Sequence, residues 1–338
     1  MARMSRAPLI SSSLDAVPPE LAGGVVTIGN FDGVHRGHAA LIDAAVAEAR
    51  RLDVPALALT FEPHPRTFFR PDFPVFRLTS ASAKASLLAA LGIAGMVVAR
   101  FDAAFATLSP DAFARDVLAG ALRAKAVVVG PGFRYGKARA GSLASLADEG
   151  TRLGFDVKVI DAVNGEGGSP ISSSAIREAL AAGEIGAANL LLGHRWLVDG
   201  NVIQGDRRGR DLGFPTANIR LGPDCRLRHG IYAVNVQWKD RTLGGVASFG
   251  RRPTFDNGAP LLEVFIFDFS GDLYGAELTV SFLDWIRPEL RFDTVSALVD
   301  AMNHDVEIAR AKLANAGPGS PLDRAVAASE VVRATPIG

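Results

Sequence analysis

Cysteine is nearly absent from this sequence: Cys225 is the one cysteine among 338 residues. A single thiol excludes an intrachain disulfide and a cysteine-rich zinc site, and it suits a reducing compartment. The first twenty residues lack the apolar segment that a signal peptide needs and soon reach Pro18-Pro19-Glu20, so neither a signal peptide nor a transit peptide is predicted. We therefore expect a cytoplasmic protein.

A surplus of charge of either sign is also absent. Lysine plus arginine and aspartate plus glutamate number 36 each. Without a net positive field, neither a nucleic acid nor an anionic membrane is expected as a partner. No apolar run approaches the about 18 residues of a membrane helix. Any phosphate must be held locally, so small molecules are the expected partners.

Short apolar runs recur through the first half of the chain, at residues 25–28, 56–61, 95–99, 126–129 and 157–160. They do not alternate, which is typical of strands buried on both faces, and helical patterns separate them. This order predicts a Rossmann-like parallel sheet with active loops at the carboxyl ends of its strands.

The pattern of predicted secondary structure changes at about residue 195. Strand-length segments at 196–203, 231–238, 244–249, 261–269 and 278–286 follow one another without helices, which predicts an antiparallel sheet or small barrel. An apolar stripe from Val295 to Leu313, behind a cap at Asp293 or Thr294, predicts one closing helix. At about 150 residues per domain, the length also favours two domains. We predict domains at 22–182 and 195–313, a hinge at 182–194 and a mobile tail at 314–338.

The pattern His35-Arg36-Gly37-His38 falls where the first strand turns into a helix. Free N–H groups and the positive end of the helix dipole favour phosphate there, and the nearby glycines allow close approach of the backbone. The two histidines could instead cap the helix, or hold a metal with His64 as third ligand. The lack of a carboxylate-rich partner favours phosphate over metal.

A second candidate anion site lies at residues 171–177. The serines at 172–174 can cap a helix, and Arg177, one turn later, can point its guanidinium at a phosphate. Taken alone, this pattern is more often a helix cap.

In this order, the motifs of the first half resemble one known family. Residues 29–38, Glu62-Pro63-His64-Pro65, residues 129–136 with Arg139 and Gly141, and residues 171–177 are similar to the FMN adenylyltransferase half of bacterial bifunctional riboflavin kinase/FMN adenylyltransferases. The resemblance implies a nucleotidylyltransferase fold in which the FMN phosphate attacks the α-phosphorus of ATP. It implies catalytic roles for His35 and His38. It also implies nucleotide or flavin binding by Gly29, Asn30, Phe31, Asp32, Gly33, Gly37, His64, Phe133, Arg134, Ser172, Ser173 and Arg177.

One position departs from the family. Where Gly132 precedes Phe133, the family usually carries Asp or Asn. The missing polar side chain puts the strength of nucleotide or flavin binding in question, and with it the adenylyltransferase activity.

A glycine-punctuated basic loop in the second half, at residues 200–218, runs into a strand. Its glycines allow backbone N–H groups to approach phosphates, and Thr216 and Asn218 place two neutral oxygens on one side of an extended segment. Such a set suits Mg²⁺, which keeps waters and substrate phosphates as its other ligands. A solvated arginine cluster and ordinary turn chemistry are the alternatives for this loop.

Glu263 is an acidic residue inside an otherwise apolar strand, so it either faces water or serves a purpose. Residues 213–218, 230–232 and 252–255, Glu263 and residues 272–275 resemble the riboflavin kinase domain of the same family. The resemblance implies that Glu263 takes the proton from the ribityl hydroxyl of riboflavin, and that Thr216 and Asn218 hold the magnesium bound to ATP. It also implies binding of ATP or flavin by Gly205, Gly209, Arg210, Gly213 and Pro215. Phe265 stands where the family often has His.

The expected function is therefore phosphorylation of riboflavin to FMN and adenylylation of FMN to FAD. Two alternatives remain: a riboflavin kinase whose first module is inactive at Gly132, and a flavin-nucleotide sensor without turnover. Intact Glu263, Thr216 and Asn218 disfavour the sensor, because binding alone needs no base.

Overall fold

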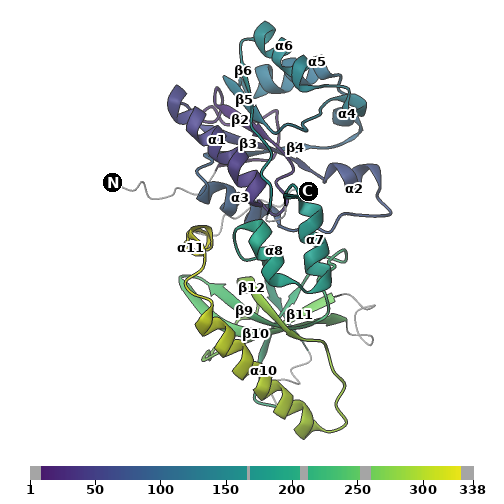
Figure 1. The fold of residues 1–338 in the computed structure, drawn as a ribbon, viewed down its shortest axis with the longest axis vertical. Helices are drawn as coiled ribbons and strands as arrows, with labels where there is room; N and C mark the ends of the chain where they lie inside the picture. Colours follow the sequence, from purple (N-terminus) through teal and green to yellow (C-terminus); the bar gives the residue numbers. More distant parts are fainter. Residues whose placement is uncertain (1–8, 166–167, 206–211, 252–259, 329–338) are drawn as a thin grey trace. The chain divides into compact units, whose positions relative to one another are not determined.

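The structure is a computed structural model that describes residues 9–165, 168–205, 212–251 and 260–328. The described residues form two compact units (Figure 1). The first unit holds residues up to Val75 and Lys84–Ile171, and the second holds Phe76–Ala83 and Ser172–Ala328.

The first unit contains a six-stranded sheet in the order β1-β4-β3-β2-β5-β6, and every pairing in it is parallel. This confirms the predicted parallel sheet. Its strands are β1 (Leu9–Ser11), β2 (Val25–Ile28), β3 (Ala56–Glu62), β4 (Gly95–Arg100), β5 (Ala126–Val129) and β6 (Asp156–Val159). The apolar pattern did not reveal β1. The expectation of burial on both faces is wrong for β6, which is largely exposed because it is an edge strand.

Helices connect these strands and cover the sheet. They are α1 (Arg36–Leu52), α2 (Pro65–Phe69), α3 (Ala81–Ala90), α4 (Ala103–Ala106), α5 (Pro110–Ala112), the π-helix η1 (Phe113–Ala121), the 3-10 helix η2 (Lys137–Arg139) and α6 (Leu143–Leu153). The buried side of α1 carries Leu41, Ile42 and Val46, and the helix runs alongside the sheet in Figure 1. Its first residue follows directly from the loop after β2, so the loop and the helix start lie at the carboxyl end of that strand.

The second unit is a closed barrel with the strand order β10-β11-β8-β7-β12-β9, and all its pairings are antiparallel. The predicted antiparallel barrel is confirmed. Its strands are β7 (Leu197–Ile203), β8 (Thr216–Arg220), β9 (Gly230–Trp238), β10 (Arg241–Arg251), β11 (Pro260–Ile266) and β12 (Glu277–Arg287). Its helices are α7 (Ser173–Ala182), α8 (Ile185–Leu192), α10 (Val295–Asn315) and α11 (Pro321–Ala328).

The closing helix α10 packs against the barrel, with Ala309 buried beside Ala233 and Phe267 (Figure 1). Thr294, one of the two caps that the sequence predicted, accepts a hydrogen bond from the backbone N–H of Ala297. The predicted apolar stripe is wrong at its start, because Val295 is 63% exposed. Beyond α10, the segment expected to be a mobile tail contains α11, while residues 329–338 lie outside the described part of the chain.

The region expected to be a hinge forms helix α8 instead. Ile185, Ala188 and Leu192 are buried in the barrel's own core cluster, together with Leu180 of α7. The side chain of Asn189 accepts a hydrogen bond from the backbone N–H of Trp196 and donates one to the carbonyl of Phe282. Both helices therefore belong to the second unit, and the helix 173–182, which we had predicted with the first domain, packs with the barrel. None of the helices within the described ranges has the length and apolar character required to cross a bilayer.

This packing predicts where the second unit can be cut. A fragment of residues 195–338 should have a free energy of unfolding at least about 3 kcal/mol lower than a fragment of residues 172–338, because it loses the buried side chains of α7 and α8 and leaves two backbone groups unpaired. Urea unfolding followed by tryptophan fluorescence measures the difference, since Trp196 lies against these helices. Equal stability of the two fragments would contradict the assignment of α7 and α8 to the barrel core.

Candidate active sites

The loop between β2 and α1 is tightly turned and buried. Phe31 and Val34 have positive φ angles of 47° and 42° and are 0% exposed. A Cβ atom on Gly29 would lie 3.2 Å from the ring of Phe31, so a side chain there would force the ring to shift. Gly33 has φ 86° and Asp32 is buried. The motif therefore forms a rigid loop that ends at the N-terminus of a 17-residue helix, where anions bind favourably.

His35 and His38 stand together at the start of α1. Nδ1 of His35 accepts a hydrogen bond from the backbone N–H of His38 at 3.2 Å, so His35 is the helix cap that the sequence left open as an alternative. The two rings stack with centroids 3.6 Å apart, and a Cβ on Gly37 would touch the His35 ring. Burial first, then the charges of His35 and Lys84, hold the pKa of His38 well below its usual value. His38 is therefore neutral at pH 7, and among the described residues its buried Nδ1 has no hydrogen-bond partner.

His64 and Glu62 end the neighbouring strand β3. Nδ1 of His64 accepts a hydrogen bond from the backbone N–H of Arg66 at 3.1 Å and caps the short helix α2. The Nζ atom of Lys84 lies 3.7 Å from Oε1 of Glu62 and donates to Oγ1 of Thr60 at 3.3 Å. Lys84 was not predicted as a site residue, because no motif marks it. Within the described ranges, no group of three or more His, Cys, Asp and Glu residues is arranged to hold a metal ion.

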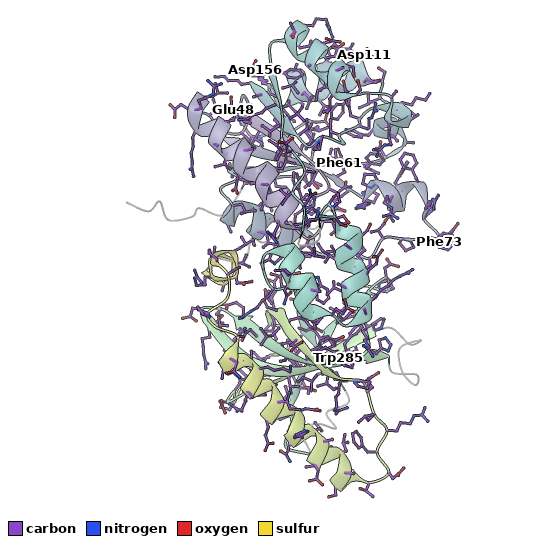
Figure 2. All side chains as sticks on the ribbon, in the orientation of Figure 1. Glu48, Phe61, Phe73, Asp111, Asp156 and Trp285 are labelled. Atoms are coloured by element: carbon purple, nitrogen blue, oxygen red, sulfur yellow. The ribbon has the colours of Figure 1, made fainter. Side chains whose placement is uncertain are left out.

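A group of phenylalanine side chains lies close to Glu62 in the first unit. Phe61, Phe68, Phe69, Phe101 and Phe105 contact one another edge-on or tilted. Phe69 is 66% exposed, and Phe73, labelled with Phe61 in Figure 2, is 74% exposed. Exposed aromatic rings in such a group suit a flat heterocycle. This aromatic group was not predicted, although several phenylalanines follow the Glu62-Pro63-His64-Pro65 motif in the sequence.

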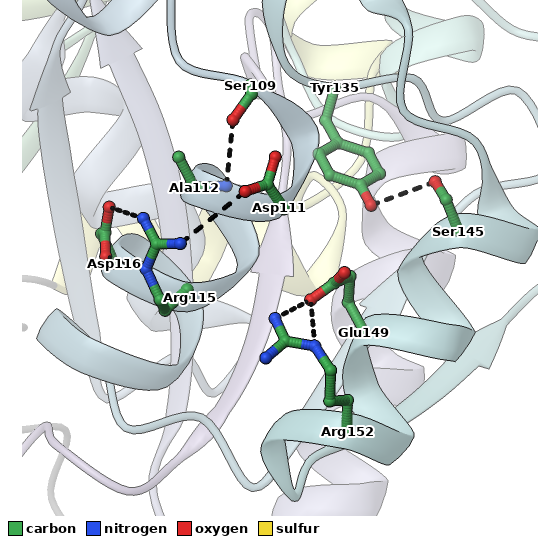
Figure 3. Close-up of polar contacts among 9 residues, drawn as sticks. All are labelled: Ser109, Asp111, Ala112, Arg115, Asp116, Tyr135, Ser145, Glu149 and Arg152. Atoms are coloured by element: carbon green, nitrogen blue, oxygen red, sulfur yellow. Dashed lines mark hydrogen bonds and ion pairs between the residues drawn. The ribbon is translucent and has the colours of Figure 1, made fainter.

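Phe133 and Tyr135 form a separate aromatic pair in the first unit. The Phe133 ring stacks on that of Tyr135, with centroids 5.7 Å apart, and the Tyr135 hydroxyl is hydrogen-bonded to Ser145 (Figure 3). Burial raises the pKa of Tyr135, so the hydroxyl stays protonated. Arg134 is exposed. A Cβ on Gly132 would meet no atom within 4 Å, and its φ is not positive, so an aspartate fits there without backbone strain.

The last motif of the first half, residues 171–177, lies in the second unit except for Ile171. Ser172 caps α7 by accepting a hydrogen bond from the backbone N–H of Ala175, as predicted, and Ser173 is the first residue of the helix. The Nε atom of Arg177 donates to the carbonyl of Phe76 at 2.7 Å. That guanidinium has a structural partner, and phosphate binding by Ser172, Ser173 and Arg177 stays a prediction from the resemblance.

The barrel contains a cavity of about 1200 Å³. Gly205, Pro215, Thr216 and Asn218 line it, as do Glu263 and apolar residues of β11 and α10. Gly213 has φ 86°, which glycine adopts without strain. Gly209 and Arg210, together with the motif at 252–255, lie outside the described residues.

Glu263, Thr216 and Asn218 meet on one wall of this cavity. Glu263 of β11 pairs directly with Asn218 of β8, and Phe265 pairs with Thr216. Leu262 and Val264, on the opposite face of the strand, are 0% exposed in the core. Strand alternation puts Glu263 on the face opposite Leu262, and Glu263 is among the residues that line the cavity.

Asn218 combines a buried side chain with an unpaired oxygen atom. It is 4% exposed, and its buried Oδ1 has no hydrogen-bond partner among the described residues. Leaving a buried acceptor unpaired costs about 1–3 kcal/mol, so this oxygen is available to a ligand. Gly205 packs directly on the amide, since a Cβ there would lie 2.5 Å from Nδ2. With Thr216 beside it, this set of neutral oxygens fits Mg²⁺.

An ion pair also lines the cavity. The guanidinium of Arg287, at the end of β12, donates to both carboxylate oxygens of Asp305 at 2.7 and 2.6 Å. Both residues line the cavity with Phe292, Leu298 and Met302. Asp305 was missed from the sequence, although an acidic residue beside Val306 on the packed side of a helix is a usable signal. A large apolar surface with two fixed charges suits a flavin ring with polar edges.

Comparisons with known proteins agree with this division. The family model described as FAD synthetase matches residues 17–175, and that described as riboflavin kinase matches residues 192–313. The chain is similar to the bifunctional riboflavin kinase/FMN adenylyltransferases of Escherichia coli (40% identity over 88% of this chain and 95% of the relative) and Haemophilus influenzae (38%, 86% and 94%). A solved structure described as a macrolide-efflux protein from Streptococcus pneumoniae shares the fold, with a TM-score of 0.79, 30% identity and coverage of 90% of this chain and 99% of that one. The two family models match one after the other along the chain, and the relatives are matched over nearly their whole length. This chain therefore belongs to the family of bifunctional riboflavin kinase/FMN adenylyltransferases.

Proposed function

We propose that the two reactions of this family are divided between the two units of this chain, riboflavin phosphorylation at the barrel cavity and adenylylation of FMN at the loop before α1. The observation that carries the first assignment is the pairing of Glu263 with Asn218 on the cavity wall, with Thr216 on the same strand as Asn218. One base and one set of metal-binding oxygens are what phosphoryl transfer to a hydroxyl requires.

In the kinase reaction, the carboxylate of Glu263 accepts the proton of the ribityl hydroxyl of riboflavin. The hydroxyl oxygen forms a bond to the γ-phosphorus of ATP, and ADP leaves with the electrons of the broken bond. Thr216 and Asn218 would hold Mg²⁺, which neutralises charge on the ATP phosphates when it is bound. Arg287 and Asp305 fix the end of the cavity where the flavin ring would lie.

In the adenylylation reaction, a phosphate oxygen of FMN attacks the α-phosphorus of a second ATP, and pyrophosphate leaves. No covalent intermediate with the protein is needed, so the chain contributes position and charge stabilisation. His38 and the N-terminus of α1 would contact the ATP phosphates, and the exposed rings around Phe69 would hold the flavin.

The thiol of Cys225 takes no part in either reaction, because burial raises its pKa to about 11. A lone thiol suits the cytoplasm as the place of both reactions.

Product identification tests the whole proposal. The protein is mixed with riboflavin, ATP and Mg²⁺, and the flavins are separated by chromatography. FMN followed by FAD is expected. FMN alone would indicate a riboflavin kinase with an inactive first module, and unchanged riboflavin would indicate a sensor.

The contact between Gly205 and Asn218 gives a sharper test of the metal site. Gly205→Ala should raise the KM for ATP in the kinase step roughly tenfold or more, because the new methyl group displaces the Asn218 amide. Conversion of added FMN to FAD by the same protein should not change. Gly222→Ala is the matched control, since a Cβ at Gly222 would meet nothing within 4 Å. Unchanged kinase kinetics in Gly205→Ala would remove Asn218 from the metal site.

A further inference from the structure

Lys84 is a buried cation without an assigned role. The residue is 1% exposed and lies on α3, in the part of that helix that belongs to the first unit. Lysine is almost never fully buried unless it is paired, because removing an ammonium from water is costly. The groups that Lys84 contacts therefore indicate what it does.

Those contacts lead to the loop before α1. Nζ of Lys84 donates to Oγ1 of Thr60 at 3.3 Å, and Oγ1 of Thr60 donates to the carbonyl oxygen of Asn30 at 3.2 Å. Oε1 of Glu62, two residues after Thr60 on β3, lies 3.7 Å from the same Nζ. A chain of hydrogen bonds thus connects a buried charge to the backbone of the loop that carries His35 and His38.

The charge of Lys84 also reaches His38. Burial first, then His35 and then the charge of Lys84, hold the pKa of His38 below its usual value. A neutral His38 keeps one ring nitrogen without a proton, whereas a protonated one would be repelled by the charge of Lys84. Lys84 is therefore linked to the loop by hydrogen bonds and to its second histidine by its charge.

We propose that Lys84 is a positioning residue for adenylyl transfer, and that its hydrogen bond through Thr60 holds the Asn30 carbonyl and the loop in the conformation that receives the ATP phosphates. This inference rests on the proposed adenylylation at this loop. It assigns Glu62 of the Glu62-Pro63-His64-Pro65 motif the role of counter-ion to Lys84.

Lys84→Met, which keeps the length of the side chain and removes the charge, tests the inference. With FMN as substrate and ATP varied, the KM for ATP should rise roughly tenfold or more, as expected for loss of a charge-assisted hydrogen bond. Riboflavin phosphorylation by the same protein should be unchanged, which checks that the chain is folded. The pKa of His38, followed by NMR of labelled histidine, should rise because a nearby positive charge is lost.

Two further variants complete the experiment. Lys158→Met is the matched control. Lys158 lies on β6, its side chain is 51% exposed, and its Nζ atom lies 3.9 Å from Oε2 of Glu48. Thr60→Val keeps the charge of Lys84 and removes the hydrogen bonds, so it should raise the KM for ATP and leave the pKa of His38 unchanged. If Lys84→Met does not fold, Thr60→Val decides alone.

The inference is overturned if the KM for ATP is unchanged in the folded variants, or if only kcat falls. A wild-type chain that forms no FAD from FMN would overturn the proposed adenylylation itself, and the inference with it. The two failures are distinguishable because the first leaves wild-type FAD formation intact.

Discussion

Replacing Glu263 by glutamine should reduce the kcat of riboflavin phosphorylation by roughly 10²–10⁴-fold, the usual contribution of a positioned general base. Glutamine keeps the shape of the side chain on the cavity wall but cannot accept the proton of the ribityl hydroxyl. Since the cross-strand pairing with Asn218 depends on the backbone, the barrel should fold as before, and the KM for ATP should change little. Steady-state assays with riboflavin and with FMN as separate substrates measure the effect.

The variant carries its own control, because conversion of added FMN to FAD should proceed at the wild-type rate. Glu277→Gln is the matched substitution, on the exposed start of β12 away from the cavity wall. It should leave both reactions unchanged. A Glu263→Gln protein that phosphorylates riboflavin at the wild-type rate would remove this residue from the mechanism.

The parts of the fold that the sequence predicted are those governed by local patterns. Continuous apolar runs marked β2 to β6, and strand-length segments that follow one another without helices marked the barrel. The loop at 29–38 was found because glycine and histidine at a strand-to-helix turn have a chemical reason to be there. Glu263 was singled out because a charge in an apolar strand needs an explanation, and the resemblance then implied its role.

The features that the sequence did not predict depend on contacts between distant segments. Residues 76–83 pack in the second unit, where the indole Nε1 of Trp196 donates to the carbonyl of Leu78 at 2.9 Å. No pattern within residues 76–83 reveals a partner more than a hundred positions away. The helix α8 was interpreted as a hinge because its alanines and glycines suggested a linker, while its burial depends on the barrel. Lys84 was missed for the same reason, since a lysine on a helix is normally exposed.

His38→Ala should have the opposite effect to Glu263→Gln. It should reduce formation of FAD from added FMN by roughly 10²-fold or more, the cost of removing one donor aimed at a developing charge, and it should leave riboflavin phosphorylation unchanged. The expectation follows from the neutral imidazole at the N-terminus of α1, whose Nδ1 bonds to no group in the described residues and so contributes no hydrogen bond to the fold there. Both substrates are assayed separately after circular dichroism confirms folding.

His304→Ala, at an exposed position of α10, is the control and should affect neither reaction. If His38→Ala abolishes both activities in a folded chain, the two reactions are coupled or their residues are misassigned; if it abolishes neither, the loop before α1 is not where the ATP phosphates bind.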